Sequence, residues 1–182
     1  MEVKEHFYAD DPSEGPPDAR TTLRGAEYFF LGNGLVQAAV QVCDVPGATA
    51  AGLLIMDPER LGPKRRALTF DPDSGLGATQ VEIIEGGTVY QARGNSVKAC
   101  RLPEGLVPWV EVAWSGGNFR VTELFCCPDR KRARLIRLVT VTHLGKRKVT
   151  ARVRTGIGNR SVEKRLRFKG SETKPVLFEY RL

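Results

Sequence analysis

The segment VPWVEVAWSGGNFRVTELF, residues 107–125, alternates apolar and polar residues on both sides of a Gly-Gly pair. A period of two residues gathers the apolar side chains on one face of an extended strand, whereas a helix would need a period of 3.6. With Gly116 and Gly117 as a two-residue turn, the segment predicts a β-hairpin with one apolar face. The register of this turn predicts three cross-strand pairs: Ser115 with Asn118, Trp114 with Phe119, and Val112 with Val121.

The same two-residue period recurs at short intervals, separated by residues that favour turns, and no long amphipathic helix is indicated. Strands are expected at residues 28–31, 35–43, 50–56, 79–84, 87–92, 107–114, 119–126, 134–142, 148–156 and 175–181. We therefore predict an all-β fold, an antiparallel two-sheet β-sandwich over residues 27–182. Residues 1–26 are acidic and proline-containing, so we expect an extended lead-in there.

A Gly-Asn-Gly triplet lies within EYFFLGNGLVQAAVQVCDVPG, residues 27–47. A phosphate-binding loop would be followed by a helix whose N-terminus faces the anion. The residues after Gly34 instead alternate in the manner of a strand. The triplet therefore predicts a turn in which Gly32 and Gly34 take positive φ angles around Asn33.

The two tryptophans of the hairpin are expected on opposite faces of the sheet. Trp114 shares a face with Val112 and is predicted to lie in the core, whereas Trp109 shares the other face with Glu111. Trp109 could stack on a sugar ring, but packing against a covering loop or domain is favoured. Trp109, together with the amide of Asn33, remains the candidate for contacts with carbohydrate or with another domain.

Charge is distributed unevenly along the chain. There are 11 basic and 18 acidic residues up to position 129, and 17 basic and 3 acidic residues from position 130 onward. Arg152 and Arg154 alternate with apolar residues and are predicted on an outer sheet face. The aromatic residues that stack on bases in RNA-binding sheets are missing, so the sequence favours a solvated face or an acidic partner domain over nucleic acid.

The titratable residues indicate no metal, cofactor or catalytic site. The four cysteines and the two histidines, His6 and His143, lack metal-ligand spacing. Adjacent Cys126 and Cys127 are interpreted as packing residues in a reducing compartment rather than as a redox pair. The expected location is the cytoplasm, because the chain shows neither the apolar core of a secretory signal nor an apolar run long enough for a membrane span.

Two stretches of the chain resemble a known group of domains. EYFFLGNGLVQAAVQ, residues 27–41, and LVPWVEVAWSGGNFRVTELFCCPDRKRARLIRLVTVTHLG, residues 106–145, are similar to the N-terminal sandwich domain of multidomain glycoside phosphorylases and hydrolases. This group includes the maltose, kojibiose and cellobiose phosphorylases and glucoamylase-like enzymes. The likeness covers about residues 27–145, and its motifs are short.

The resemblance implies a galactose-mutarotase-like supersandwich, and the chain is shorter than such domains usually are. It also implies that catalysis takes place in a separate (α/α) barrel, so that this chain is expected to be a non-catalytic, N-terminal piece of a larger carbohydrate-active enzyme. A homodimer is compatible with this expectation. The alternatives are a free-standing carbohydrate-binding module and a basic domain that binds nucleic acid.

Catalysis by the chain itself is not expected. Aldose epimerases of the mutarotase fold use a histidine pair with a glutamate, and His6 and His143 do not supply that pair. Glu82, Glu111 and Glu123 fall on predicted strands, but spacing alone does not show that any two of them converge on one sugar.

Overall fold

The computed structural model describes residues 26–43, 50–56, 76–93, 98–102, 109–129, 131–157 and 160–181. The extended lead-in was predicted for residues 1–26. Residues 1–25 lie outside these ranges, and Ala26 is the first residue of the first strand. The described elements are twelve strands and one 3-10 helix: β1 (Ala26–Gly32), β2 (Gln37–Cys43), β3 (Gly52–Met56), η2 (Leu76–Thr79), β4 (Glu82–Glu85), β5 (Thr88–Gln91), β6 (Lys98–Leu102), β7 (Trp109–Gly116), β8 (Phe119–Cys126), β9 (Arg134–His143), β10 (Val149–Ile157), β11 (Arg160–Phe168) and β12 (Glu172–Arg181).

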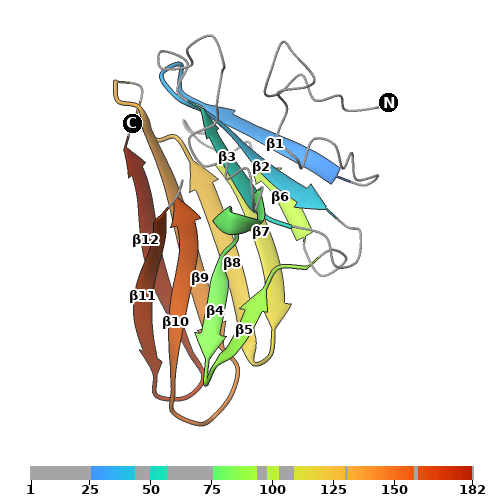
Figure 1. The fold of residues 1–182 in the computed structure, drawn as a ribbon, viewed down its shortest axis with the longest axis vertical. Coiled ribbons are helices and arrows are strands. Elements are labelled where there is room, and N and C mark those ends of the chain that lie inside the picture. Colours follow the sequence, from blue (N-terminus) through green and yellow to red (C-terminus); the bar gives the residue numbers. More distant parts are fainter. Residues whose placement is uncertain are drawn as a thin grey trace.

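The strands form three antiparallel sheets, which confirms the all-β prediction. Their orders are β1-β2-β3, β11-β10-β4-β5 and β12-β9-β8-β7-β6. The five-stranded sheet forms one layer, and the three- and four-stranded sheets lie over its upper and lower parts (Figure 1). The arrangement is sandwich-like, but the second layer is divided into two sheets where a single sheet was predicted.

The helix η2 lies between the two sheets of the divided layer and connects them. Thr79 accepts a hydrogen bond from the Leu53 amide of β3 through Oγ1 (2.6 Å), and its carbonyl accepts one from Thr155 Oγ1 of β10 (2.9 Å). Gly156 lets β10 approach this helix, because a Cβ there would overlap the carbonyl oxygen of Ala78. The segment 79–84 is therefore a 3-10 helix end followed by a short strand, and not one continuous strand as predicted.

Inward-facing residues of all three sheets form one continuous hydrophobic core. It contains Val40 and Leu53 from the three-stranded sheet, Val153 from the four-stranded sheet, and Phe125 and Val139 from the five-stranded sheet, each fully buried. Strands β8 and β9 show the most regular alternation between buried residues and partly or fully exposed ones. Burial of this apolar surface is the main driving force for folding.

The central hairpin β7-β8 confirms the predicted faces but corrects the predicted register. Trp114 pairs with Val121 and Gly116 with Phe119, so the two-residue turn is Gly117-Asn118. Gly117 has a φ of 54°, as the first central position of a type II′ turn requires. A shift of two residues along the partner strand keeps every side chain on its own face, which is why alternation alone could not fix the register.

Two strands were not predicted from the sequence. Strand β11 has the sequence RSVEKRLRF, and its residues are mostly exposed, because it lies at the edge of the four-stranded sheet. Strand β6 lies at the edge of the five-stranded sheet beside β7. Edge strands carry many charged residues, which discourages pairing with other chains and weakens the alternation that marks a strand.

Candidate functional site

Asn33 closes the connection between β1 and β2 and uses its amide within the chain. Its Oδ1 accepts hydrogen bonds from the backbone amides of Leu35 and Val36, each at 3.0 Å. Its Nδ2 donates to the carbonyl oxygens of Asp129 and Arg132, the latter at 2.8 Å. Gly34 has the expected positive φ of 89° in this predicted turn. Gly32 instead ends β1 with an ordinary φ, where an added Cβ would lie 3.0 Å from the Val36 carbonyl oxygen.

Trp109 lies on the outer face of the five-stranded sheet, opposite the buried Trp114, as predicted. It is half-buried, and its Nε1 is shielded from solvent without a hydrogen-bond partner among the described residues. Glu111 lies on the same face, beside Leu124 and half-buried, whereas the other described neighbours of Trp109 on this face are apolar. With Trp109, they form what we call the outer apolar patch: Trp109, Leu124, Cys126, Ile136, Leu138 and Leu177.

The outer apolar patch follows two rows that cross the strands. Leu124 of β8, Leu138 of β9 and Leu177 of β12 lie side by side in register. The next row contains Trp109, Cys126 and Ile136. Leu177 is 50% exposed, and the other members are half-buried. The patch is thus an apolar surface on the face of the sheet that points away from the core.

Glu123 is one of the three carboxylates on predicted strands, and it lies in the core of the sandwich. Its Oε1 accepts a hydrogen bond from Trp114 Nε1 (2.7 Å), and its Oε2 lies 2.6 Å from Arg137 Nη2. Both charged side chains are 0% exposed. A carboxylate held in this way is inaccessible to a substrate.

Arg137 of β9 connects the five-stranded sheet to both sheets of the other layer. Its Nη1 donates to the Thr79 carbonyl oxygen (2.6 Å) and to Thr155 Oγ1 (3.0 Å), and its Nη2 donates to the Ala51 carbonyl oxygen (3.4 Å). The guanidinium also lies 5.0 Å from the ring centre of Phe125. Burial alone disfavours the charged form and lowers the pKa of Arg137, but the Glu123 carboxylate and Tyr180 together outweigh burial and raise this pKa.

This buried polar cluster was missed in the sequence, although a signal for it exists. Glu123 stands between Val121 and Phe125 on the inward face of β8, and Arg137 occupies the same kind of position in β9. Two opposite charges at core positions of neighbouring strands indicate a buried ion pair, because an unpaired charge is too costly to bury.

The predicted outer-face arginines do lie on the outer face of the four-stranded sheet. Arg154 pairs with Glu82, which also accepts a hydrogen bond from Gln91 (2.7 Å). Arg152 Nη1 lies 3.4 Å from Glu163 Oε2. Both arginines thus have carboxylate partners inside the sheet, and these come from β4 and from the unpredicted strand β11.

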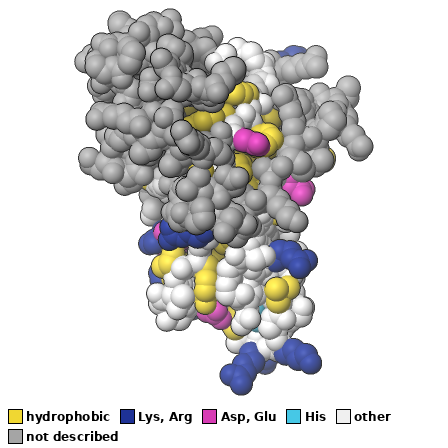
Figure 2. Space-filling view, turned by 90° about the vertical axis from the view of Figure 1, so that its right-hand side faces the viewer, with side chains coloured by type: hydrophobic (Ala, Val, Ile, Leu, Met, Phe, Trp, Pro, Cys, Tyr) yellow, Lys and Arg dark blue, Asp and Glu magenta, His cyan; other side chains and the backbone are white. Residues whose placement is uncertain are grey.

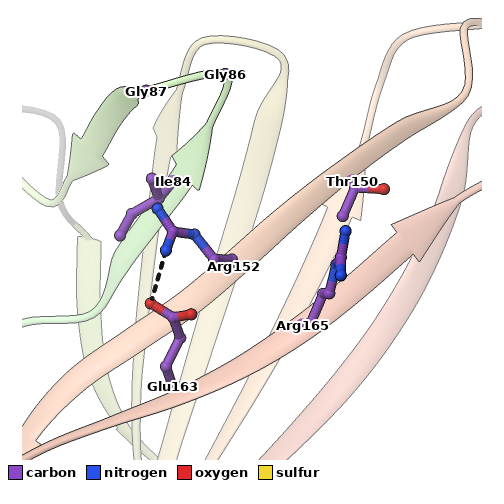
Figure 3. A pocket seen from close by; sticks show the side chains of 7 residues that line it. All are labelled: Ile84, Gly86, Gly87, Thr150, Arg152, Glu163 and Arg165. Atoms are coloured by element: carbon purple, nitrogen blue, oxygen red, sulfur yellow. Dashed lines mark ion pairs between the residues drawn. The ribbon is translucent and has the colours of Figure 1, made fainter.

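A pocket of about 350 Å³ opens on this same face beside the turn between β4 and β5. Its lining residues are Ile84, Gly86, Gly87, Thr150, Arg152, Glu163 and Arg165. The Arg152 side chain reaches toward Glu163, and the Arg165 side chain extends toward Thr150 (Figure 3). The volume is near the lower limit for small-molecule sites.

Basic side chains also gather at the lower tip of the molecule, where the β9-β10 turn lies (Figure 2). Lys146, Arg147 and Lys148 of this turn are exposed. Buried His143 precedes the turn, and its Nδ1 lies 2.8 Å from the Gly170 carbonyl oxygen. His143 therefore lies between the β9-β10 turn and the turn that contains Gly170. His6 lies outside the described residues.

The three cysteines whose side chains the structure describes show the features of packing residues. Cys43, Cys126 and Cys127 are free thiols, and adjacent Cys126 and Cys127 are raised in pKa by burial, Cys127 to about 12. A redox-active cysteine needs a lowered pKa. In the described ranges, no group of His, Cys, Asp and Glu side chains is arranged to hold a metal ion.

Comparison with known proteins identifies no relative for this chain. No protein-family model matches it, and the comparison found no match among curated proteins or solved structures. Across the described part of the chain, no helix is long and apolar enough to span a membrane.

Proposed function

We propose that this chain is a non-catalytic accessory domain of a carbohydrate-active enzyme, a glycoside hydrolase or phosphorylase, and that its outer apolar patch packs against the helical catalytic domain. The observation that carries this proposal is the row Leu124, Leu138 and Leu177 on the outer face of the five-stranded sheet. The carbohydrate assignment rests on the resemblance of residues 27–145.

The outer face of an antiparallel sheet is normally polar when it faces water. A contiguous apolar area on such a face typically marks a contact with another protein surface. Here the area spans four adjacent strands, β12, β9, β8 and β7, and includes Trp109, a residue type that is enriched at interfaces. These features favour a packed domain contact over a solvated face.

Two of the three strand carboxylates named from the sequence, Glu82 and Glu123, support a non-catalytic role. Hydrolysis of a glycosidic bond generally requires two carboxyl groups about 5 to 9.5 Å apart that face the sugar. Glu123 is buried in its ion pair, and Glu82 is bound to Arg154 and Gln91. Neither is free to act as an acid or a base.

A dye-binding experiment tests the use of the patch. Nile red, a neutral hydrophobic dye, should bind the folded chain, and the double variant L138S/L177S should lose most of this binding. The matched control is V89S/L144S, which removes two apolar residues that are 46% and 48% exposed elsewhere on the surface. Equal dye binding by both variants would show that the patch is not a distinct apolar surface.

A second set of measurements separates the functional classes. We expect no turnover of nitrophenyl glycosides, no calorimetric signal with glucosides and no salt-sensitive gel shift with nucleic acid. Sugar binding that Trp109→Ala abolishes would replace the proposal with a free-standing carbohydrate-binding module. The sequence encoded after Leu182 is the most direct check, because the proposal requires a helical catalytic domain there.

A further inference from the structure

The outer face of the four-stranded sheet has an uneven charge distribution from one row to the next. In the first row, Arg154 lies between Glu82 and Glu163, so acidic residues flank it on both sides. In the next row, Arg152 lies between Ile84 and Arg165. Positive charge therefore exceeds negative charge from this row toward the β4-β5 turn.

Arg152 and Arg165 are direct cross-strand partners, and like charges in this position destabilise a sheet. Glu163 reaches Arg152 from the neighbouring row, at 3.4 Å. Arg165 has no carboxylate partner in the described part of the chain, and neither has Arg167, which follows on the same face of β11. A bound anion would offset this repulsion.

The pocket has the other features of an anion site. Buried Ile84 forms an apolar floor, and the Thr150 hydroxyl lies on the side to which Arg165 extends (Figure 3). Gly86 and Gly87 form its rim with positive φ angles of 54° and 90°, and their missing side chains leave the rim open. Two arginines, a hydroxyl donor and an open rim thus line one concave surface, on which Arg152 is turned toward Glu163 and Arg165 toward Thr150 (Figure 3).

We propose that this pocket binds a tetrahedral oxyanion, either inorganic phosphate or the phosphate group of a small ester, between Arg152 and Arg165. The planar guanidinium groups donate paired hydrogen bonds to phosphate oxygens. Thr150 supplies a further donor. The pocket lies on a different sheet from the outer apolar patch, so this inference does not rest on the proposed function.

Titration calorimetry with inorganic phosphate tests the site, with chloride buffer of equal ionic strength as the reference. We expect saturable binding by the unmodified chain. In R152Q/R165Q the affinity for phosphate should fall by a factor of about ten or more, because hydrogen bonds to charged groups are lost. The control R160Q/K164Q removes the same charge from exposed positions of β11 that do not line the pocket. It should bind phosphate as the unmodified chain does.

A single variant protects the test against a folding defect. R165Q alters a side chain with no ion pair among the described residues, so it should fold normally and still bind phosphate more weakly. Absence of saturable phosphate binding, or equal weakening in R165Q and in R160Q/K164Q, would overturn the site. The source of the anion follows from glucose 6-phosphate: tighter binding than inorganic phosphate identifies an ester, and equal binding identifies phosphate itself.

Discussion

Arg137 Nε and Nη2 lie 2.8 Å and 2.6 Å from Glu123 Oε2 in an ion pair whose side chains are both fully buried. The two residues come from neighbouring strands of one layer, while the remaining donors of Arg137 bind backbone and hydroxyl groups of the other layer. The pair therefore fixes how the two layers meet. Such a cluster contributes to the specificity of the fold when every polar group is satisfied.

Removing one partner of this pair should be strongly destabilising. Glu123→Ala leaves the Arg137 charge buried without a counter-ion, and we expect the free energy of unfolding to fall by about 3–5 kcal/mol. Urea denaturation followed by circular dichroism measures the change. The double variant E123L/R137M replaces both charges with apolar groups and should be less destabilised than E123A. Equal losses in the two variants would contradict a dominant role for the uncompensated charge.

Gly156 should tolerate no side chain. Gly156→Ala places a methyl group against the Ala78 carbonyl oxygen, so β10 or η2 must move, and overpacking of this kind typically costs about 1–3 kcal/mol. The matched control is Gly170→Ala, where the nearest atom to the new Cβ is the Lys146 carbonyl oxygen at 3.4 Å. Thermal denaturation should show a clear drop for the first variant and little change for the second.

The faces of the strands could be predicted from sequence, because alternation depends on the residues of one strand alone. The opposite faces of Trp109 and Trp114 follow from it directly. Register depends on the turn, and the sequence offers two adjacent glycines as candidates. The structure selects Gly117, and Tyr90 of β5 packs so closely there that a Cβ would lie 2.6 Å from its ring. That contact is tertiary and cannot be inferred from the hairpin sequence.

The candidate sites depend more strongly on tertiary structure. The oxyanion pocket requires Arg165 to lie opposite Arg152, and this follows from strand β11, whose exposed edge position hides the strand pattern. Asn33 shows the reverse case. Its place in a turn was predictable, but its bonds to Asp129 and Arg132 join segments about a hundred positions apart, and no local pattern indicates them.

Asn33 provides a test of its structural role. Asn33→Ala removes both donors and the acceptor, so stability should fall by about 1–3 kcal/mol. Asn33→Asp keeps an acceptor for the amides of Leu35 and Val36 but sets a carboxylate against two carbonyl oxygens, so we expect at least as large a loss at neutral pH. Chemical denaturation of both variants provides the comparison. An Asp variant as stable as the original chain would show that the Nδ2 contacts are unimportant.

The thiol of Cys127 should make stability depend on pH in the alkaline range. Burial, with a smaller effect of the neighbouring Cys126 thiolate, raises the pKa of Cys127 from its ordinary value of 9.0 to about 12 in the folded chain. Between these values the unfolded chain has lost a proton that the folded chain retains, so the free energy of unfolding decreases as pH rises. The contribution is fully present below pH 9.0 and disappears toward pH 12. Cys127→Ala should flatten this decline relative to the unmodified chain, and the difference between the two removes the effects of other groups.

Alkylation at pH 8, followed by peptide mass spectrometry, should modify Cys127 only after unfolding, because the thiolate is the reactive form. Rapid modification of Cys127 in the folded chain would contradict its burial and favour the alternative, a redox pair, over packing residues.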